Sequence, residues 1–397
     1  MDLTVIIVNF NVKFFLEQAL HSVIKAGSPL KVEVIVVDNN STDGSKEYLN
    51  IKFPQVNFIW NDFNPGFAAS CNLGLQSAQG EFILFLNPDT IVPEDCFVKC
   101  LNFIKTTSNC GALGVKMLDG SGGFLKESKR GFPGAIASFF RLSGLTFLFP
   151  KSKTISSYYA GNLSKNEDNE IDIIAGAFFM VKKSILNKVG GFDEQFFMYG
   201  EDIDLSYRIQ KEGYKNFYFS QSPIIHFKGE STNKSNSYNN IFYNAMHLFV
   251  NKHYKGFYKI PMHFAIKTGR FFSSIKLKIK SSNNKNINSL NKNIAIVSNP
   301  ESINQIEKLL SLSILNKYPR HNLAVNSNHT ELEALLANID DNLVSHILFS
   351  EGNLSYKQII SWIEEHQGKY KFLFHSNKCS SIIWSDYKDA NGNFISE

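Results

Sequence analysis

EFILFLNPDT, residues 81–90, is the stretch of sequence that decides the fold. Its run Phe82–Leu86 is continuously apolar, which is typical of a strand buried on both faces of a sheet. Pro88 ends that strand, because proline has no backbone N–H and restricts the preceding residue to extended geometry. Asp89 follows just past the carboxyl end of the strand, where open α/β sheets place their ligand crevice. Its carboxylate indicates either a loop-stabilising Asx turn or a ligand for a hard cation.

Strands and helices alternate on both sides of this stretch. Strands are predicted at 3–10, 32–37, 56–60, 112–117, 171–181, 214–219 and 223–227, with helical patterns such as 13–26 and 97–104 between them. Strands separated by helices indicate βαβ units and a mostly parallel central sheet, so the fold class is α/β. After an Asn- and Ser-rich linker the alternation of strands and helices begins again, with strands predicted at 293–298, 322–326, 345–349 and 370–375.

We therefore expect three parts: a main α/β domain over 1–254, a basic segment with linker over 255–289, and a small accessory α/β domain of Rossmann-like type over 290–397. The first turn of the accessory domain, Ser298–Glu301, has none of the glycines of a dinucleotide fingerprint. Nucleotide binding is not expected there.

Hydropathy, cysteine content and charge exclude several classes of protein. The sequence predicts no secretory signal and has no run of about 18 apolar residues. The five cysteines show no metal-ligand spacing, which indicates reduced thiols in a cytoplasmic protein. The net charge of +5 is concentrated, since Ser231–Pro300 holds ten lysines, one arginine and no acidic residue. The remainder is acidic, which argues against a nucleic-acid partner.

Two segments are candidates for contact with a membrane. Residues 255–280 interleave cations with Phe and Ile, which favours peripheral binding to the anionic inner face of the cell membrane over a solvated basic face. Residues 131–150 are crowded with Phe and Leu around Arg141, and they indicate either a core helix or an interfacial segment.

Carboxylates follow or flank the strands of the main domain. Asp38 and Asp89 each come after a strand, and a third group, Glu201, Asp202 and Asp204, comes before His226. Four loops that converge on one edge of a sheet fit a site for a charged, metal-bound ligand. Each residue also has a plain structural explanation: Asp202 can be a helix N-cap, Asp204 can form a surface ion pair with Arg208, and His226 can be a packed strand residue.

Residues 1–250 resemble the family 2 glycosyltransferases, inverting enzymes with the A-type fold, and within them the bacterial rhamnosyltransferase-like branch. The resemblance rests on six motifs that are specific only in combination: Val5–Asn9, Val37–Ser45, Asn64–Ala68 with Asn72 and Gly74, Leu86–Thr90, Gly176–Met180, and Gly190–Glu194 with Gly200–Leu205.

The resemblance implies a role for each site residue. Asp38 corresponds to the carboxylate that binds the pyrimidine base of the donor, with Asn9 and Asn64 in the same nucleotide pocket. Asn87-Pro-Asp89 corresponds to the Asp-X-Asp metal motif, so Asn87 offers only a neutral oxygen and Asp89 carries the charge. His226 corresponds to a late metal-ligating histidine. Asp202 corresponds to the catalytic base, with Glu201 as the second candidate for that role.

These implications lead to a metal-dependent inverting transferase. It would move a hexosyl or rhamnosyl group from a UDP- or dTDP-sugar to a hydroxyl of a glycan or lipid-linked acceptor, in surface polysaccharide synthesis. Mg²⁺ or Mn²⁺ would stabilise the diphosphate leaving group, and a carboxylate would remove the proton of the acceptor hydroxyl. Two alternatives stay open: a degenerate module that binds glycan or partner without catalysis, and a nucleotidyltransferase. The latter normally opens with a glycine-rich basic loop, which the turn after Asn9 lacks.

Overall fold

The computed structural model describes residues 1–132, 157–227, 236–270 apart from 257, 258, 261, 265 and 269, 293–324, 343–386 apart from 378, and 392–396. The apolar segment 133–150, most of the basic segment 255–280 and the predicted helix at 330–338 lie outside these residues.

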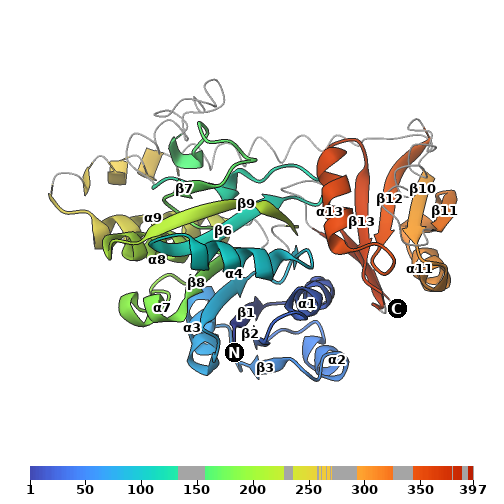
Figure 1. Ribbon diagram of the computed structural model, residues 1–397, viewed down its shortest axis with the longest axis horizontal. Coiled ribbons are helices and arrows are strands. Elements are labelled where there is room, and N and C mark those ends of the chain that lie inside the picture. Colours follow the sequence, from blue (N-terminus) through green and yellow to red (C-terminus); the bar gives the residue numbers. More distant parts are fainter. Residues whose placement is uncertain are drawn as a thin grey trace.

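The N-terminal part is built around a mixed sheet of nine strands in the described chain, eight of them in the order β3-β2-β1-β4-β8-β6-β9-β5, with β7 paired to β9 (Figure 1). The strands are β1 (Leu3–Asn9), β2 (Val32–Asp38), β3 (Asn57–Trp60), β4 (Phe82–Leu86), β5 (Thr90–Ile91), β6 (Cys110–Leu118), β7 (Asn169–Ile171), β8 (Phe178–Lys182) and β9 (Lys215–His226). The helices are α1 (Lys13–Gly27), α2 (Ser45–Lys52), α3 (Phe67–Ser77), α4 (Cys96–Thr106), α7 (Lys183–Val189), α8 (Glu201–Lys211) and α9 (Asn236–His253). The expected α/β fold with a mostly parallel sheet is confirmed, since only β8, β5 and β7 run against the other strands.

The central strands are buried on both faces, as the apolar run 82–86 predicts. On β1, Val5 and Ile7 belong to the core shared with α1, α2 and α4, whereas Ile6 and Val8 belong to the core shared with α3, α7 and α8. This division follows from the two-residue period of a strand, which sends successive side chains to opposite faces. β1 and β2 pair in register, and Asn9 lies opposite Asp38 at their carboxyl ends.

Two predicted elements differ from the structure. The expected strand at 171–181 is divided into β7 and β8, because the residues between them bond elsewhere. The Ile173 N–H donates to the Arg130 carbonyl at 3.0 Å, and the Phe178 N–H donates back to Ala175 at 3.2 Å. The two short strands expected at 214–219 and 223–227 form one strand, β9.

The C-terminal part is a second sheet, with strand order β11-β10-β12-β13-β14-β15. Its elements are β10 (Asn293–Ser298), α11 (Pro300–Ser311), β11 (Arg320–Ala324), β12 (Val344–Ser350), α13 (Tyr356–Glu365), β13 (Lys371–His375), β14 (Ser381–Trp384) and β15 (Asn393–Ser396). The first four strands are parallel, and β14 and β15 continue the sheet antiparallel. The expected Rossmann-like α/β arrangement is therefore present.

The two sheets share one apolar core. Val12, Phe15, Ile225 and Phe227 of the N-terminal part belong to the same buried cluster as many residues of the C-terminal sheet and α13. The Phe227 ring packs edge-on against Phe374, with ring centroids 5.3 Å apart. Figure 1 shows α13 and β13 beside the end of β9.

Polar contacts also join the N-terminal part to the C-terminal part. Glu94 accepts hydrogen bonds from the backbone N–H groups of Tyr356 (2.8 Å) and Lys357 (3.1 Å) in the first turn of α13. A carboxylate at that place satisfies free N–H groups of the helix and complements its dipole. Within the described residues, no helix is both long and apolar enough to cross a bilayer.

Candidate functional site

A pocket opens at the carboxyl ends of β1 and β4 and at the N-terminus of α8. Its polar lining includes Asn39, Asn64, Asn87, Arg130, Glu201, Asp202 and His226, and its aromatic lining includes Phe10, Phe67, Tyr158, Tyr159, Tyr199 and Phe242. A concave site with a few convergent polar groups in an apolar wall is the usual form of a small-molecule site. Five of the eight predicted site residues thus line a single pocket, and Asn9, Asp38 and Asp89 lie behind its wall.

One side of the pocket brings together Asn87, Asp89 and His226. Strand β5 pairs with the end of β9, which places Thr90 opposite His226. As a result the His226 Nε2 atom lies 3.3 Å from Asp89 Oδ1 and 3.2 Å from the side-chain nitrogen assigned to Asn87. Since the two ends of an amide side chain are interchangeable in such assignments, the Asn87 oxygen can occupy the same place. The His226 Nδ1 atom is buried without a hydrogen-bond partner among the described residues.

These three side chains fit a divalent cation. They offer a carboxylate oxygen, an amide oxygen and an imidazole nitrogen, all of which are ligands for Mn²⁺, and Mg²⁺ accepts the two oxygens. Asp89 and His226 are both buried, so neither is an ordinary surface residue. The expected pairing of Asp89 with His226 is present, and metal binding itself stays a prediction.

A second group lies behind the pocket wall at the ends of β1 and β2. The Asn9 Nδ2 atom donates to Asp38 Oδ2 at 2.6 Å, and Asp38 Oδ1 accepts the backbone N–H of Ser41 at 2.8 Å. Both carboxylate oxygens of Asp38 are therefore engaged within the protein. Asn39 lines the pocket instead, and its Nδ2 atom donates to Asn64 Oδ1 at 3.2 Å. Recognition of a base by Asp38 itself stays a prediction, whereas Asn39 and Asn64 are the groups that line the pocket here.

The opposite side of the pocket holds Glu201 and Asp202 in the first turn of α8. Gly200, with a left-handed φ of 84°, occupies the N-cap position of α8, so Asp202 is not the N-cap. Asp202 Oδ2 instead forms an ion pair with Arg130 and accepts the Gly176 N–H at 3.1 Å. The Asp202 carboxylate is thus held by a buried cation and by a backbone donor.

Glu201 has a different environment. Burial, together with the charge of neighbouring Asp202, raises the pKa of Glu201 to about 8. Its Oε2 atom is buried without a hydrogen-bond partner among the described residues. A carboxyl group whose pKa is raised by burial and by a neighbouring charge is common at catalytic sites.

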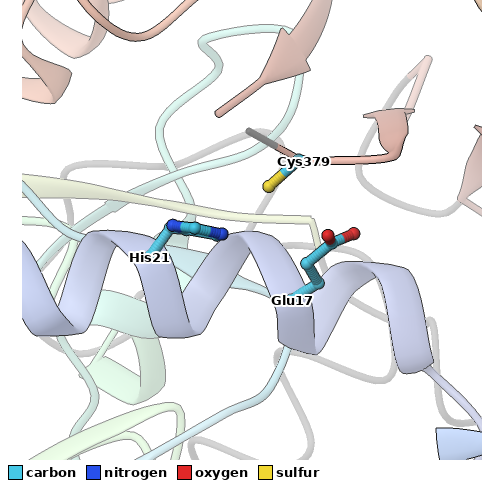
Figure 2. A group of neighbouring side chains, drawn as sticks. All are labelled: Glu17, His21 and Cys379. Atoms are coloured by element: carbon cyan, nitrogen blue, oxygen red, sulfur yellow. The ribbon is translucent and has the colours of Figure 1, made fainter. Parts of the chain in front are cut away.

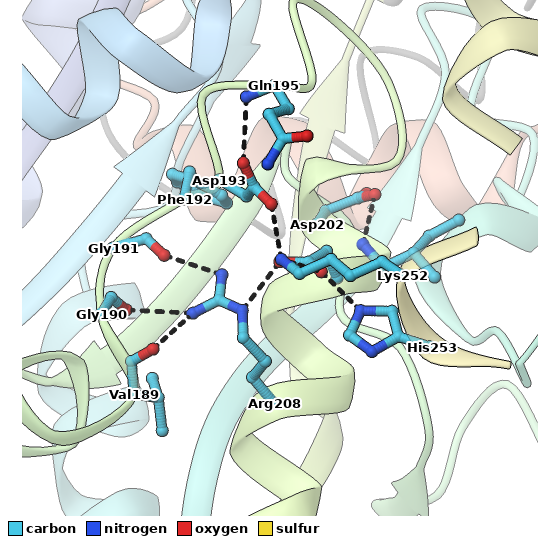
Figure 3. Close-up of polar contacts among 12 residues, drawn as sticks. Val189, Gly190, Gly191, Phe192, Asp193, Gln195, Asp202, Arg208, Lys252 and His253 are labelled. Atoms are coloured by element: carbon cyan, nitrogen blue, oxygen red, sulfur yellow. Dashed lines mark hydrogen bonds and ion pairs between the residues drawn. The ribbon is translucent and has the colours of Figure 1, made fainter. Parts of the chain in front are cut away.

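The helix that carries this pair is anchored by Asp204. The expected ion pair of Asp204 with Arg208 is present, but Asp204 is fully buried, so the pair does not lie on the surface. It bonds Arg208 Nε at 2.7 Å, Lys252 Nζ at 2.8 Å and His253 Nε2 at 2.6 Å. Arg208 also donates to the carbonyl groups of Val189, Gly190 and Gly191, so α8 is tied to α9 and to the Gly190–Gly191 turn (Figure 3).

Sequence reasoning missed Asn39 and Arg130. Asn39 directly follows Asp38 in a polar cluster of the sequence. Only the structure shows that Asn39 lines the pocket while Asp38 lies behind its wall. Arg130 is 72 residues from Asp202 in the chain. Nothing in its local sequence indicates a partner at the start of α8, because the contact depends on how the segment after β6 folds back.

Comparisons with known proteins show which families and relatives this chain resembles. The model of glycosyl transferase family 2 matches residues 4–190, and that of the N-terminal domain of galactosyltransferase matches residues 158–230. An N-acetylglucosaminyl-diphospho-decaprenol L-rhamnosyltransferase of Mycobacterium tuberculosis is 25% identical over 248 residues, which cover 59% of this chain and 80% of the relative. The rhamnosyltransferase WbbL of Escherichia coli K12 is 29% identical over 150 residues, covering 38% of this chain and 53% of the relative. The solved mannosyltransferase PcManGT of Pyrobaculum calidifontis, in complex with GDP-Man and Mn²⁺, aligns with a TM-score of 0.46 at 17% identity, covering 72% of this chain and 76% of that one.

Proposed function

We propose that this chain moves a sugar from a nucleotide diphosphate donor to a hydroxyl of a glycan or lipid-linked acceptor, because the model of glycosyl transferase family 2 matches residues 4–190. A relative is named for transfer of L-rhamnose to a lipid-linked N-acetylglucosamine, which supports a rhamnosyl or hexosyl group and an acceptor of that class. The observation that carries the proposal is the arrangement of the pocket, with Asn87 and His226 on one side, Asp89 buried beside them, and Glu201 and Asp202 on the other side.

Each side supplies one half of the reaction. Asp89, His226 and Asn87 would hold Mg²⁺ or Mn²⁺, which neutralises charge on the diphosphate of the donor as the bond to the sugar breaks. Asp202 would accept the proton of the acceptor hydroxyl as its oxygen bonds to the anomeric carbon. The nucleoside diphosphate leaves from the opposite face of the sugar, so the anomeric centre is inverted.

Arg130 and Glu201 support Asp202 in this scheme. Arg130 forms an ion pair with Asp202 and would hold its carboxylate in place for the acceptor hydroxyl. Glu201, whose pKa is raised to about 8, carries its proton at neutral pH and can donate a hydrogen bond to a sugar oxygen. Asn39 and Asn64 offer amide groups to the uracil or thymine of a UDP- or dTDP-sugar.

The test combines binding with turnover. UDP and dTDP are titrated calorimetrically into the full chain with and without Mn²⁺, and release of nucleoside diphosphate is followed with a panel of donor sugars and lipid-linked acceptors. Metal-dependent binding that Asp89→Ala abolishes, together with transfer of sugar, is the expected result. Asp62→Ala, which removes an exposed carboxylate, is the matched control.

Other outcomes would identify another function. Tight binding of nucleotide or glycan without turnover in any donor and acceptor pair indicates a module that binds but does not catalyse. Release of pyrophosphate from a nucleoside triphosphate indicates nucleotidyl transfer. Normal metal-dependent transfer by a folded Asp89→Ala variant would show that the cation lies elsewhere.

A further inference from the structure

Three side chains with metal-binding atoms meet where the two sheets join, on elements that do not line the pocket. We propose that Glu17, His21 and Cys379 bind a divalent cation of the zinc class, which joins α1 to the C-terminal sheet (Figure 2). This site does not depend on the proposed transferase activity, and its cation would have a structural role.

The fold brings the three residues together. Glu17 and His21 are four residues apart on α1, a spacing that puts both side chains on one face of a helix. Cys379 belongs to the segment between β13 and β14, which packs on that face. One ligand atom from each residue lies within 4.8 Å of the other two.

The spacing is close to that of a bound ion. Around a tetrahedral zinc ion, with bonds of about 2.0 to 2.3 Å, neighbouring ligand atoms lie roughly 3.5 Å apart. The three side chains need to draw together by roughly an ångström to reach that spacing, which small side-chain rotations provide.

The donor set selects the kind of cation. Thiolate sulfur, imidazole nitrogen and carboxylate oxygen are the three protein ligands of zinc, and thiolate in particular is a poor ligand for Mg²⁺ or Ca²⁺. On binding, the cation replaces the proton of the Cys379 thiol, which is released to solvent. The fourth position would be filled by water or by a further group of the interface.

His21 gives an independent reason to expect a ligand. Its Nε2 atom is buried and has no hydrogen-bond partner among the described residues. A buried polar atom without a partner costs stability, and a metal bond would remove that cost.

Glu17 is already oriented as a ligand would be. Its Oε1 atom accepts a hydrogen bond from Tyr48 at 2.7 Å and pairs with Lys52, and its Oε2 atom accepts the Ser381 hydroxyl at 2.6 Å. Oε1 already has two partners, whereas Oε2 keeps a second lone pair, so these donors can hold the group while Oε2 binds a cation. The ion pair with Lys52 is enough to explain the buried carboxylate of Glu17. It leaves the His21 Nε2 atom without a partner among the described residues.

Cobalt(II) is the probe, because a cobalt–thiolate bond gives a charge-transfer absorption that oxygen and nitrogen ligands do not. The full chain is freed of metal with a chelator and titrated with Co²⁺. The expected result is one equivalent bound with the thiolate absorption, displacement by Zn²⁺, and a higher melting temperature on binding. Because Asp89 and His226 offer no sulfur, the absorption separates this site from the one in the pocket.

Two variants and one control complete the test. Cys379→Ser and His21→Gln should each weaken Co²⁺ binding by about 100-fold or more, and Cys379→Ser should abolish the thiolate absorption. Cys110→Ser removes another buried thiol and should leave both unchanged. If the wild-type chain shows no thiolate absorption at excess Co²⁺, or if a folded Cys379→Ser variant keeps it, the three residues are only a hydrogen-bonded part of the interface and the proposal is wrong.

Discussion

Glu201 and Asp202 are adjacent carboxyl groups in opposite electrostatic surroundings. Asp202 has a buried arginine as its partner, whereas the Glu201 Oε2 atom has no hydrogen-bond partner among the described residues. Sequence reasoning could place both residues near the site, because the motif around Gly200 is recognisable. It could not separate their charge states, since these depend on Arg130 and on burial.

Asp202→Asn should reduce sugar transfer by about 100- to 10,000-fold, the usual range for loss of a general base. The amide keeps the size of the side chain but cannot accept a proton. Binding of the nucleotide should change little, which calorimetry with UDP or dTDP will show. Glu201→Gln should cause the smaller loss, and the assignment of the base is wrong if Glu201→Gln is inactive while Asp202→Asn still transfers sugar.

The raised pKa of Glu201 predicts a pH-dependent stability. Between its ordinary pKa of 4.5 and about 8, the folded protein holds a proton that the unfolded chain releases. The free energy of unfolding therefore falls as pH rises across this window, by up to about 1.4 kcal/mol per pH unit from this group. Glu201→Gln removes that dependence, so the variant should gain stability relative to wild type between pH 5 and 8 in urea unfolding. Parallel curves for the two proteins would contradict the predicted burial of a neutral carboxyl.

At the scale of elements, helix α8 depends on one buried carboxylate. Burial acts to raise the pKa of Asp204, but hydrogen bonds from His253 and Lys252 and the charge of Arg208 outweigh it and lower the pKa to about 2. This stabilisation is present above pH 4 and is lost as the pH falls toward 2. Asp204 therefore holds the first turn of α8, with Glu201 and Asp202, in a fixed place relative to α9.

Asp204→Asn should lower the free energy of unfolding by about 3 to 5 kcal/mol, because it removes the buried charge to which Arg208 and Lys252 are paired. Transfer activity of the folded fraction should fall as well, since the pair at the start of α8 loses its anchor. Thermal melting and kcat measured below the melting transition will show both effects. Glu212→Gln, which breaks an exposed pair with Lys188, should leave the melting temperature nearly unchanged.

Element prediction from the sequence succeeded where burial determines the local pattern. The strand Phe82–Leu86 was predicted at its observed bounds, because both of its faces are covered and its composition is continuously apolar. The division between β7 and β8 was not predictable. It arises from long-range bonds such as that from the Ile173 N–H to the Arg130 carbonyl, which the local sequence does not encode.

At the scale of the whole molecule, the sequence predicted two α/β units but not how tightly they join. Apolar residues such as Phe15 and Phe227 fit the core pattern of the first unit equally well. Only the structure shows that they pack against the second sheet.

Removal of residues 290–397 should therefore expose a continuous apolar surface on α1 and β9. We expect the shortened chain to aggregate and to bind a dye for exposed apolar surface, as large uncovered patches do. Replacing Phe15 and Phe227 with polar residues in the shortened chain should recover part of the soluble yield. A monomeric, well-folded shortened chain without these changes would show that the C-terminal unit is dispensable for folding.

The shared core also has a consequence for the order of events during synthesis. The strands β1 to β9 leave the ribosome before any strand of the second sheet. Because translation proceeds at about 5 to 20 residues per second, several seconds pass before the second sheet can form. During that interval the faces of α1 and β9 that carry Phe15 and Phe227 have nothing to cover them. We expect chaperones to bind nascent chains during this interval, and ribosome-bound chains halted before and after residue 384 should differ in the amount of chaperone they retain.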